Sequence, residues 1–147
     1  YRLQRETLIE ETRRENRNWL GMEVEIVHFG SESHSRNHAA LKFGNWSENE
    51  AVPVRVQAVS SYGDFIDVLL QQHNSLNSTL DIIQKEGRGL LVLLENEKRN
   101  NDERDYGIGA QIIRSLSVSK MKLISTSQIK RSALEGYGLE ITEYIRL

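Results

Sequence analysis

The feature that most constrains the fold of this chain is an uninterrupted run of apolar residues, Leu90–Leu94. Because every side chain in the run is apolar, a strand formed here would have to bury both of its faces. Such strands lie inside a sheet that is covered by other layers of secondary structure, most often helices. The run therefore predicts a central strand in a sheet covered by helices.

Strand and helix patterns alternate around this run. Apolar residues at helical spacing predict one helix through Leu80 and Ile83 and another through Ile108 and Ile112. Residues 52–58 alternate apolar and polar side chains, which predicts a half-buried strand. Further strands are predicted over residues 22–29, 38–43, 121–125 and 139–147, with loops at residues 30–33 and 44–45. Strands first, and then helices and strands in alternation, predict a single α/β domain with one mixed sheet covered by helices.

The first 18 residues have a different composition. Residues 2–17 contain five arginines and four glutamates but only three apolar residues. Charges of mixed sign at helical spacing favour an exposed helix held by ion pairs between successive turns. We therefore expect a tail helix or linker over residues 1–18 and one domain over residues 19–147. The opposite charges nearly cancel, which argues against a nucleic-acid-binding arm.

Composition excludes several classes of protein. The chain of 147 residues has a net charge of −2, which does not favour nucleic acid or an anionic membrane as a partner. No apolar run approaches the roughly 20 residues that cross a bilayer, and the first residues do not resemble a secretory signal. There is no cysteine, which removes disulfides and thiolate metal sites. These observations predict a cytoplasmic protein.

Several segments match the pattern of one enzyme family. Residues 106–112 read Tyr-Gly-Ile-Gly-Ala-Gln-Ile, and residues 134–140 read Leu-Glu-Gly-Tyr-Gly-Leu-Glu. Glu-Gly-Arg-Gly at residues 86–89 precedes the central run, and Val-Arg-Val at residues 54–56 precedes Gly63 and Asp64. In this order the segments resemble the GTP cyclohydrolase II family, which opens the imidazole ring of GTP at the start of riboflavin synthesis. The resemblance covers most of the chain from residue 22 onward, and it implies that family's fold, GTP as a ligand and a homodimer.

The first residues resemble a second family. Residues 1–14, which begin Tyr-Arg-Leu-Gln-Arg-Glu-Thr-Leu-Ile, are similar to the final helix of 3,4-dihydroxy-2-butanone 4-phosphate synthase. In many bacteria this synthase is fused ahead of the cyclohydrolase domain. The resemblance implies that the chain is the C-terminal part of such a two-domain protein, with the fused synthase domain as its partner and with none of the synthase's catalytic residues.

The resemblance also implies a catalytic zinc, for which the chain lacks ligands. The family holds this zinc with three thiolates and leaves the fourth position to water. The corresponding positions fall at Ser60 and near Gln71 and His73. A hydroxyl and an amide are poor zinc ligands, so we expect no metal and no cofactor, and an ordinary polar loop in their place. The remaining candidates among the histidines form no cluster by spacing: His28, His34 and His38.

Nucleotide binding requires positive charge and backbone donors for the triphosphate. The resemblance places these groups after the central strand, at Glu97 and Arg99. Two residues of the family's Arg-Gln-Glu-Gly-Arg segment are replaced, the first arginine by Glu95 and the glycine by Lys98. The acidic replacement would repel a triphosphate, and the loss of glycine removes a close backbone approach. The segment is therefore expected to bind nucleotide less well than its counterparts.

The resemblance assigns catalytic roles to Asp102 and Arg104, as a general base and as the group that acts on phosphate. An acidic residue directly before a helix is also an ordinary N-cap, and that alternative stays open for Asp102. Roughly two dozen family residues that precede this position, including a catalytic tyrosine, have no counterpart. Further along, Ser125 and Lys130 stand where the family contacts its ligand, although a solvated polar loop would look the same.

Three functions follow from these observations. The first is a degenerate domain that does not open GTP and serves a structural or regulatory role for the synthase. The second is an active cyclohydrolase with a site rebuilt around Asp102 and Arg104. The third is a nucleotide-sensing module that uses Arg99, Arg104 and Lys130 without turnover.

Overall fold

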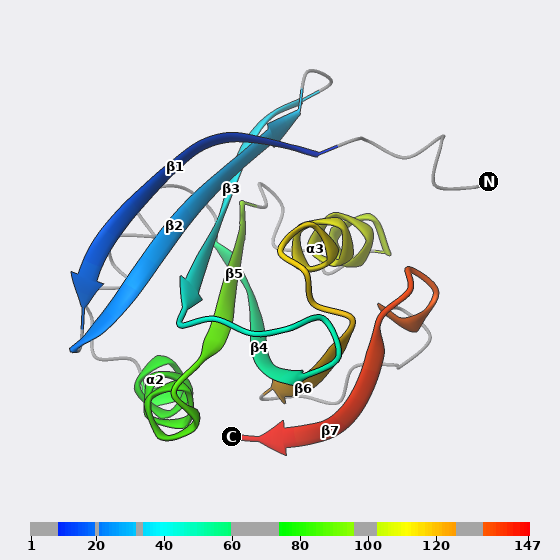
Figure 1. The fold of residues 1–147 in the computed structure, drawn as a ribbon. Helices are drawn as coiled ribbons and strands as arrows, with labels where there is room; N and C mark the ends of the chain where they lie inside the picture. The colour runs from blue at the N-terminus through cyan, green and yellow to red at the C-terminus, as the bar shows by residue number, and fades with distance from the viewer. Residues whose placement is uncertain (1–8, 20, 32–33, 60–73, 96–102, 126–133) are drawn as a thin grey trace.

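The computed structural model describes residues 9–19, 21–31, 34–59, 74–95, 103–125 and 134–147. Its strands form one seven-stranded sheet in the order β1-β2-β3-β5-β4-β6-β7, and helices pack against the sheet (Figure 1). The strands are β1 (Glu10–Trp19), β2 (Met22–Ser31), β3 (His34–Phe43), β4 (Ala51–Val59), β5 (Gly89–Glu95), β6 (Lys120–Ser125) and β7 (Glu140–Arg146), and the helices are α2 (Asn74–Glu86) and α3 (Glu103–Ser115). The predicted α/β class, with a mixed sheet covered by helices, is confirmed.

The central apolar run forms β5, as predicted. Its side chains alternate between two core clusters: Leu90, Val92 and Leu94 belong to the larger cluster, and Leu91 and Leu93 to the smaller one. The larger cluster contains the apolar side chains of α3, and the smaller one those of α2. The two helices therefore cover opposite faces of the sheet, which is why both faces of β5 are apolar.

Strand direction divides the sheet into two halves. The pairs β1–β2, β2–β3 and β3–β5 are antiparallel. The pairs β4–β5, β4–β6 and β6–β7 are parallel. As a result β4, β5 and β6 run in the same direction, and their carboxyl ends meet at one edge of the sheet. This arrangement sets the position of the candidate site.

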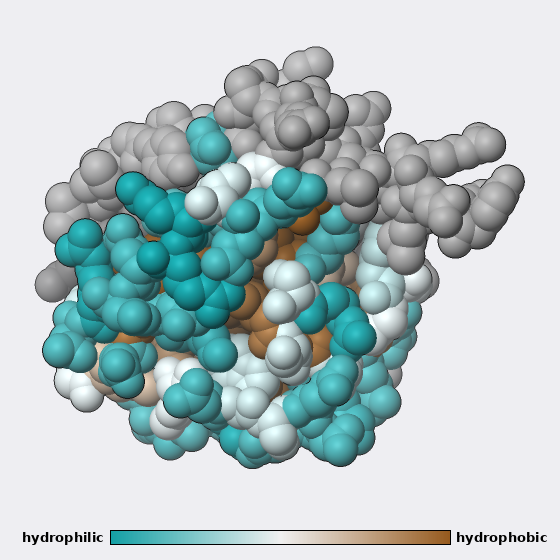
Figure 2. Space-filling view, turned by 45° about the horizontal axis from the view of Figure 1, so that its top comes forward, coloured by the Kyte–Doolittle hydropathy of each residue, from teal (hydrophilic) through white to brown (hydrophobic). Residues whose placement is uncertain are grey.

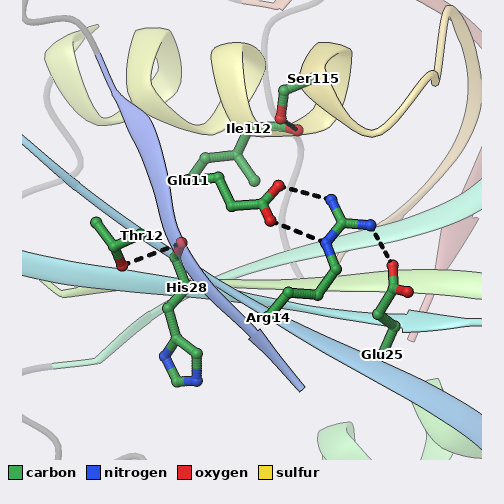
Figure 3. A network of polar contacts seen from close by, with 7 residues as sticks. All are labelled: Glu11, Thr12, Arg14, Glu25, His28, Ile112 and Ser115. Carbon is green, nitrogen blue, oxygen red and sulfur yellow. Dashed lines mark hydrogen bonds and ion pairs between the residues drawn. The ribbon is translucent and has the colours of Figure 1, made fainter. Parts of the chain in front are cut away.

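Strand β1 corrects the predicted helix over residues 2–17, which is wrong for residues 10–17. β1 pairs antiparallel with β2, and Gly21 in the turn between them has a φ of 72°. The expected ion pairs between helical turns are replaced by contacts of Arg14 with Glu11 and with Glu25 on β2, each with a shortest N–O distance of 2.6 Å (Figure 3). Because nearly all side chains of β1 are exposed, no apolar stripe distinguishes helix from strand in its sequence.

Two smaller expectations are also corrected. Gly30 and Ser31 were expected in a loop but continue β2, because the β2–β3 ladder extends to the pair Ser31↔His34. His34 and His38 consequently lie in β3. Strand β4 was expected to be half-buried, yet Pro53 and Arg55 are buried as well as the valines, because α2 covers the second face of the sheet. Among the described residues, no helix is both long and apolar enough to cross a membrane.

Candidate functional site

The carboxyl ends of β4, β5 and β6 form the candidate site. Val59 at the end of β4 pairs with Glu95 at the end of β5, and β6 ends at Ser125 on the other side of β4. Ligands of open α/β sheets bind outside the carboxyl ends of parallel strands, because the connecting loops converge there. Residues 60–73, 96–102 and 126–133 follow these three ends directly in the sequence.

Most of the residues expected in the site fall in those segments and lie outside the described residues: Ser60, Gln71, His73, Glu97, Arg99, Asp102 and Lys130. Their roles stay predictions. Arg104 lies in the first turn of α3, which begins at Glu103, and Asp102 directly precedes that helix in the sequence. A cation in the first turn gains nothing from the helix dipole, whereas an anion bound there would be favoured.

Ser125 is the expected site residue that the structure describes most fully. It is 9% exposed at the end of β6, where it pairs with Arg146 of β7. The carbonyl of Ser125 accepts a hydrogen bond from the backbone N–H of Leu147 at 3.1 Å. The last strand thus fixes the point at which the segment after β6 begins.

His38 fixes the corresponding point on β5. The β3–β5 ladder ends at the pair Ala39↔Leu93. Beyond it, the Nδ1 atom of His38 accepts a hydrogen bond from the backbone N–H of Glu95 at 3.0 Å, and the Glu95 carboxylate accepts one from the Asn37 N–H at 3.4 Å. Since Nδ1 is an acceptor, this geometry requires the uncharged ring with its proton on Nε2. His38 is 2% exposed, so it acts as an internal support of the strand end.

Arg55 on β4 is a candidate binding residue that sequence reasoning missed. It is 7% exposed and points toward the carboxyl end of its strand, since its Nη2 donates to Oε1 of Gln57 at 3.3 Å. Its Nε and Nη1 atoms have no hydrogen-bond partner in the described part of the chain. Burial lowers the pKa of Arg55 from its ordinary value. The sequence signal that could have identified Arg55 is a positively charged residue within a predicted strand, on the face that a helix covers.

A buried cation with unsatisfied donors is costly, and a bound anion would offset that cost. Arg55 and Gln57 lie on the face that α2 covers, because the alternate residues Val52 and Val54 belong to the α3 side. His38 and Ser125, which support β5 and β6 at this edge, lie on the opposite face of the sheet, because the alternate residues Ala40 and Leu123 belong to the larger cluster. The arrangement suits a small anionic ligand.

Within the ranges described above, histidine, aspartate and glutamate form no group of three that could hold a metal ion. His28 contacts Arg13, with Nε2 of the ring 3.2 Å from Nη2 of the arginine. Burial and, to a smaller degree, the charge of Arg13 lower the pKa of His28.

Figure 2 shows one side of the molecule on which hydrophilic side chains predominate and apolar residues are visible mainly near the middle.

Comparison with known proteins gives a consistent family assignment. The model of the GTP cyclohydrolase II family matches residues 10–102 and 97–146 as two pieces. The two matches meet between β5 and α3, within the segment that follows the central strand. Together they include every described strand and helix of the domain.

Curated relatives cover the whole chain. Riboflavin biosynthesis protein RibBA from Porphyromonas gingivalis is 32% identical over 186 positions, which cover 100% of this chain and 44% of the relative. RibBA from Aquifex aeolicus is 34% identical over 176 positions, covering 99% of this chain and 43% of the relative. A 3,4-dihydroxy-2-butanone 4-phosphate synthase from Helicobacter pylori is 28% identical over 149 positions, covering 100% and 42%. The chain spans less than half the length of these relatives.

A solved structure has the same fold. RibBX from A. baumannii, described as a two-domain 3,4-dihydroxy-2-butanone 4-phosphate synthase, superposes with a TM-score of 0.65 at 23% identity. The superposition covers 98% of this chain and 42% of RibBX.

Proposed function

The chain belongs to the GTP cyclohydrolase II family, and we propose that it is the cyclohydrolase-like part of a two-domain riboflavin-biosynthesis protein that has lost GTP ring opening. The observation that carries the proposal is the absence of cysteine from a chain of 147 residues. The zinc implied by the resemblance is held by three thiolates, and hydroxyl and amide groups do not replace them. The residues present therefore do not fit that metal.

The lengths of the alignments support the loss of a further part of the site. The P. gingivalis protein aligns over 186 positions, 39 more than this chain contains, whereas the H. pylori protein aligns over 149. The H. pylori relative, which is of similar length in this region, is named for the synthase alone. The family match also breaks into two pieces at residues 97–102, where the catalytic segment was expected to be missing.

The contacts of Ile9, the first described residue, support a structural or regulatory role toward a fused synthase. The backbone N–H of Ile9 donates to Oε1 of Gln111 on α3 at 3.2 Å, and its side chain packs against the larger core cluster. A domain preceding residue 9 would thus be tied to the helix whose first turn carries Arg104. Such an attachment would fix the orientation of the two domains relative to each other, and this role does not require catalysis in the second domain.

The first experiment measures chemistry and metal content together. Purified full-length protein is incubated with GTP, magnesium and zinc, formate release is followed, and bound zinc is measured by mass spectrometry. The P. gingivalis RibBA protein serves as the family comparison. We expect no formate above background and far less than one zinc per chain. Sustained formate release would overturn the proposal in favour of a rebuilt active site around Asp102 and Arg104.

The second experiment tests the role toward the synthase. Synthase activity, thermal midpoint and molecular mass are compared between the full-length protein and a version that ends before residue 9. A supporting domain predicts a fall in at least one of these quantities. If all three are unchanged, the structural and regulatory roles are both rejected. A homodimer stays a prediction that the mass measurement also tests.

Nucleotide binding without turnover is the second candidate, and Arg55 is the observation that favours it. A guanidinium that is 7% exposed, and that has two nitrogen atoms without a partner among the described residues, fits an anion such as a phosphate group. Calorimetric titration of GTP with magnesium tests this function. Saturable heat that is lost when Arg55 or the set Arg99, Arg104 and Lys130 is replaced would support a sensor. The absence of binding at millimolar GTP would reject it.

A further inference from the structure

Strand β1 forms one end of the sheet, and among the described strands it pairs only with β2. It is ten residues long and contains no proline, and its outer backbone groups pair with no other strand that the structure describes. Such an edge is a template for pairing with another strand, and charged side chains commonly limit that pairing. The order of the charges on β1 also determines which partner and which register the edge can accept.

We propose that β1 pairs antiparallel with β1 of a second copy of this chain, about a two-fold axis at Asn16. When two identical edges pair in this way, the residue on the axis lies opposite its own copy. Between Arg13 and Arg17, Asn16 is the only uncharged residue. Any other centre in this stretch would place two like charges directly opposite each other, which destabilises a strand pair.

The register centred on Asn16 brings opposite charges together on both sides of the axis. Glu15 lies opposite Arg17 of the second copy, and the symmetry repeats the pair. The side chains of Arg13 and Arg17 are 66% and 67% exposed, so both have room for a new partner, although each already lies within 4.0 Å of Glu15. Arg13 lies opposite Trp19, whose half-buried ring offers a face for a cation.

This interface is independent of the proposed function, because it uses neither the candidate site nor the positions of the family's zinc ligands. It lies at the opposite end of the strand order from β7. Pairing through β1 would join the two sheets into one continuous sheet and leave the carboxyl ends of β4, β5 and β6 of each copy free to bind a ligand.

Site-directed cross-linking tests the register directly, because the chain contains no native cysteine. Directly opposed residues of antiparallel strands have Cβ atoms about 4.5–5.5 Å apart, close to disulfide geometry. The 147-residue chain carrying Asn16→Cys is therefore expected to form a disulfide dimer under mild oxidation. In the same register the two copies of Asn18 are separated by roughly four residues, about 13 Å along the strands. The matched Asn18→Cys variant is expected to stay uncross-linked.

A charge-reversal pair tests the energetics by sedimentation. Glu15→Arg places arginine opposite arginine, so the dimer is expected to weaken at least roughly tenfold. The double variant Glu15→Arg with Arg17→Glu restores opposite charges and is expected to dimerise like the wild type. A wild-type chain that stays monomeric at about 100 μM, equal cross-linking of the two cysteine variants, or no effect of Glu15→Arg would each overturn the proposal.

Discussion

Replacing Arg55 by methionine is expected to stabilise the protein and, if the domain binds nucleotide as the second candidate function proposes, to weaken that binding. The buried guanidinium makes one described hydrogen bond, to Gln57, and leaves Nε and Nη1 without partners in the described part of the chain. Each buried unsatisfied donor costs about 1–3 kcal/mol, while a hydrogen bond to a charged group contributes about 1.5–3 kcal/mol. Methionine has a similar shape without these donors. We therefore expect the free energy of unfolding to rise by about 1–3 kcal/mol.

The assay combines urea unfolding with calorimetric titration of GTP. The chain has two tryptophans, Trp19 and Trp46, so unfolding can be followed by fluorescence. The Arg55→Met variant should unfold at a higher urea midpoint with an unchanged slope, and its affinity for GTP should fall at least roughly tenfold. Arg88→Met is the control, because Arg88 is a half-buried arginine paired with Glu50 at the other end of the sheet.

The control should change stability by no more than about 1 kcal/mol and leave GTP binding unaltered. Two results would refute the reasoning about Arg55. If Arg55→Met lowers the free energy of unfolding by more than about 1 kcal/mol, the guanidinium is a supporting element of the native core. If stability rises but GTP still binds with wild-type affinity, the buried cation has no role in ligand binding.

Three further outcomes are expected. Gly89→Ala should destabilise the protein by about 1–3 kcal/mol, because the new Cβ would lie 2.5 Å from Cγ1 of Ile83. The same substitution should cost much less in an Ile83→Ala background, which a double-mutant cycle of urea unfolding measures. The ion pair with Arg14 lowers the pKa of Glu11, so the stability gap between wild type and Glu11→Gln should be present near neutral pH and shrink below pH about 4.3, measured by unfolding against pH. Burial lowers the pKa of His28 in the folded protein, so the unfolded chain binds a proton at this histidine at a higher pH than the folded protein does. The wild type should therefore lose stability relative to His28→Gln as the pH falls below about 6.5. A stability difference that stays constant with pH would contradict this reasoning.

The sequence predicts the core of this fold well, because the core is built from strong patterns. The run Leu90–Leu94 can satisfy its apolar character only between two layers, and it lies between α2 and α3 as expected. The helical spacing of Ile108 and Ile112 likewise leaves little choice of structure. Residue periodicity does not predict β1, because its side chains are nearly all exposed and form no apolar face. Pairing with β2 determines its conformation instead.

The candidate site is less predictable from sequence for a physical reason. Residue patterns describe how a segment meets the core, whereas a site depends on which strand ends meet. The alternation around Arg55 suggested a half-exposed strand, and only the position of α2 shows that this arginine is buried. His38 was expected at the start of a strand, but its contact with Glu95 was not predictable, because that contact depends on where the β3–β5 ladder ends.

The two halves of the sheet also impose an order on folding. Strands β1, β2 and β3 follow one another and can pair through short turns, whereas the β4–β6 ladder must join Val54 to Leu123. Closing a long loop costs entropy before any contact compensates for it, so distant parallel strands form slowly. We expect the hairpins to assemble early and β6 to dock late. During that interval the newly made chain would expose the unpaired side of β4, and such an unpaired strand edge favours aggregation until β6 has docked.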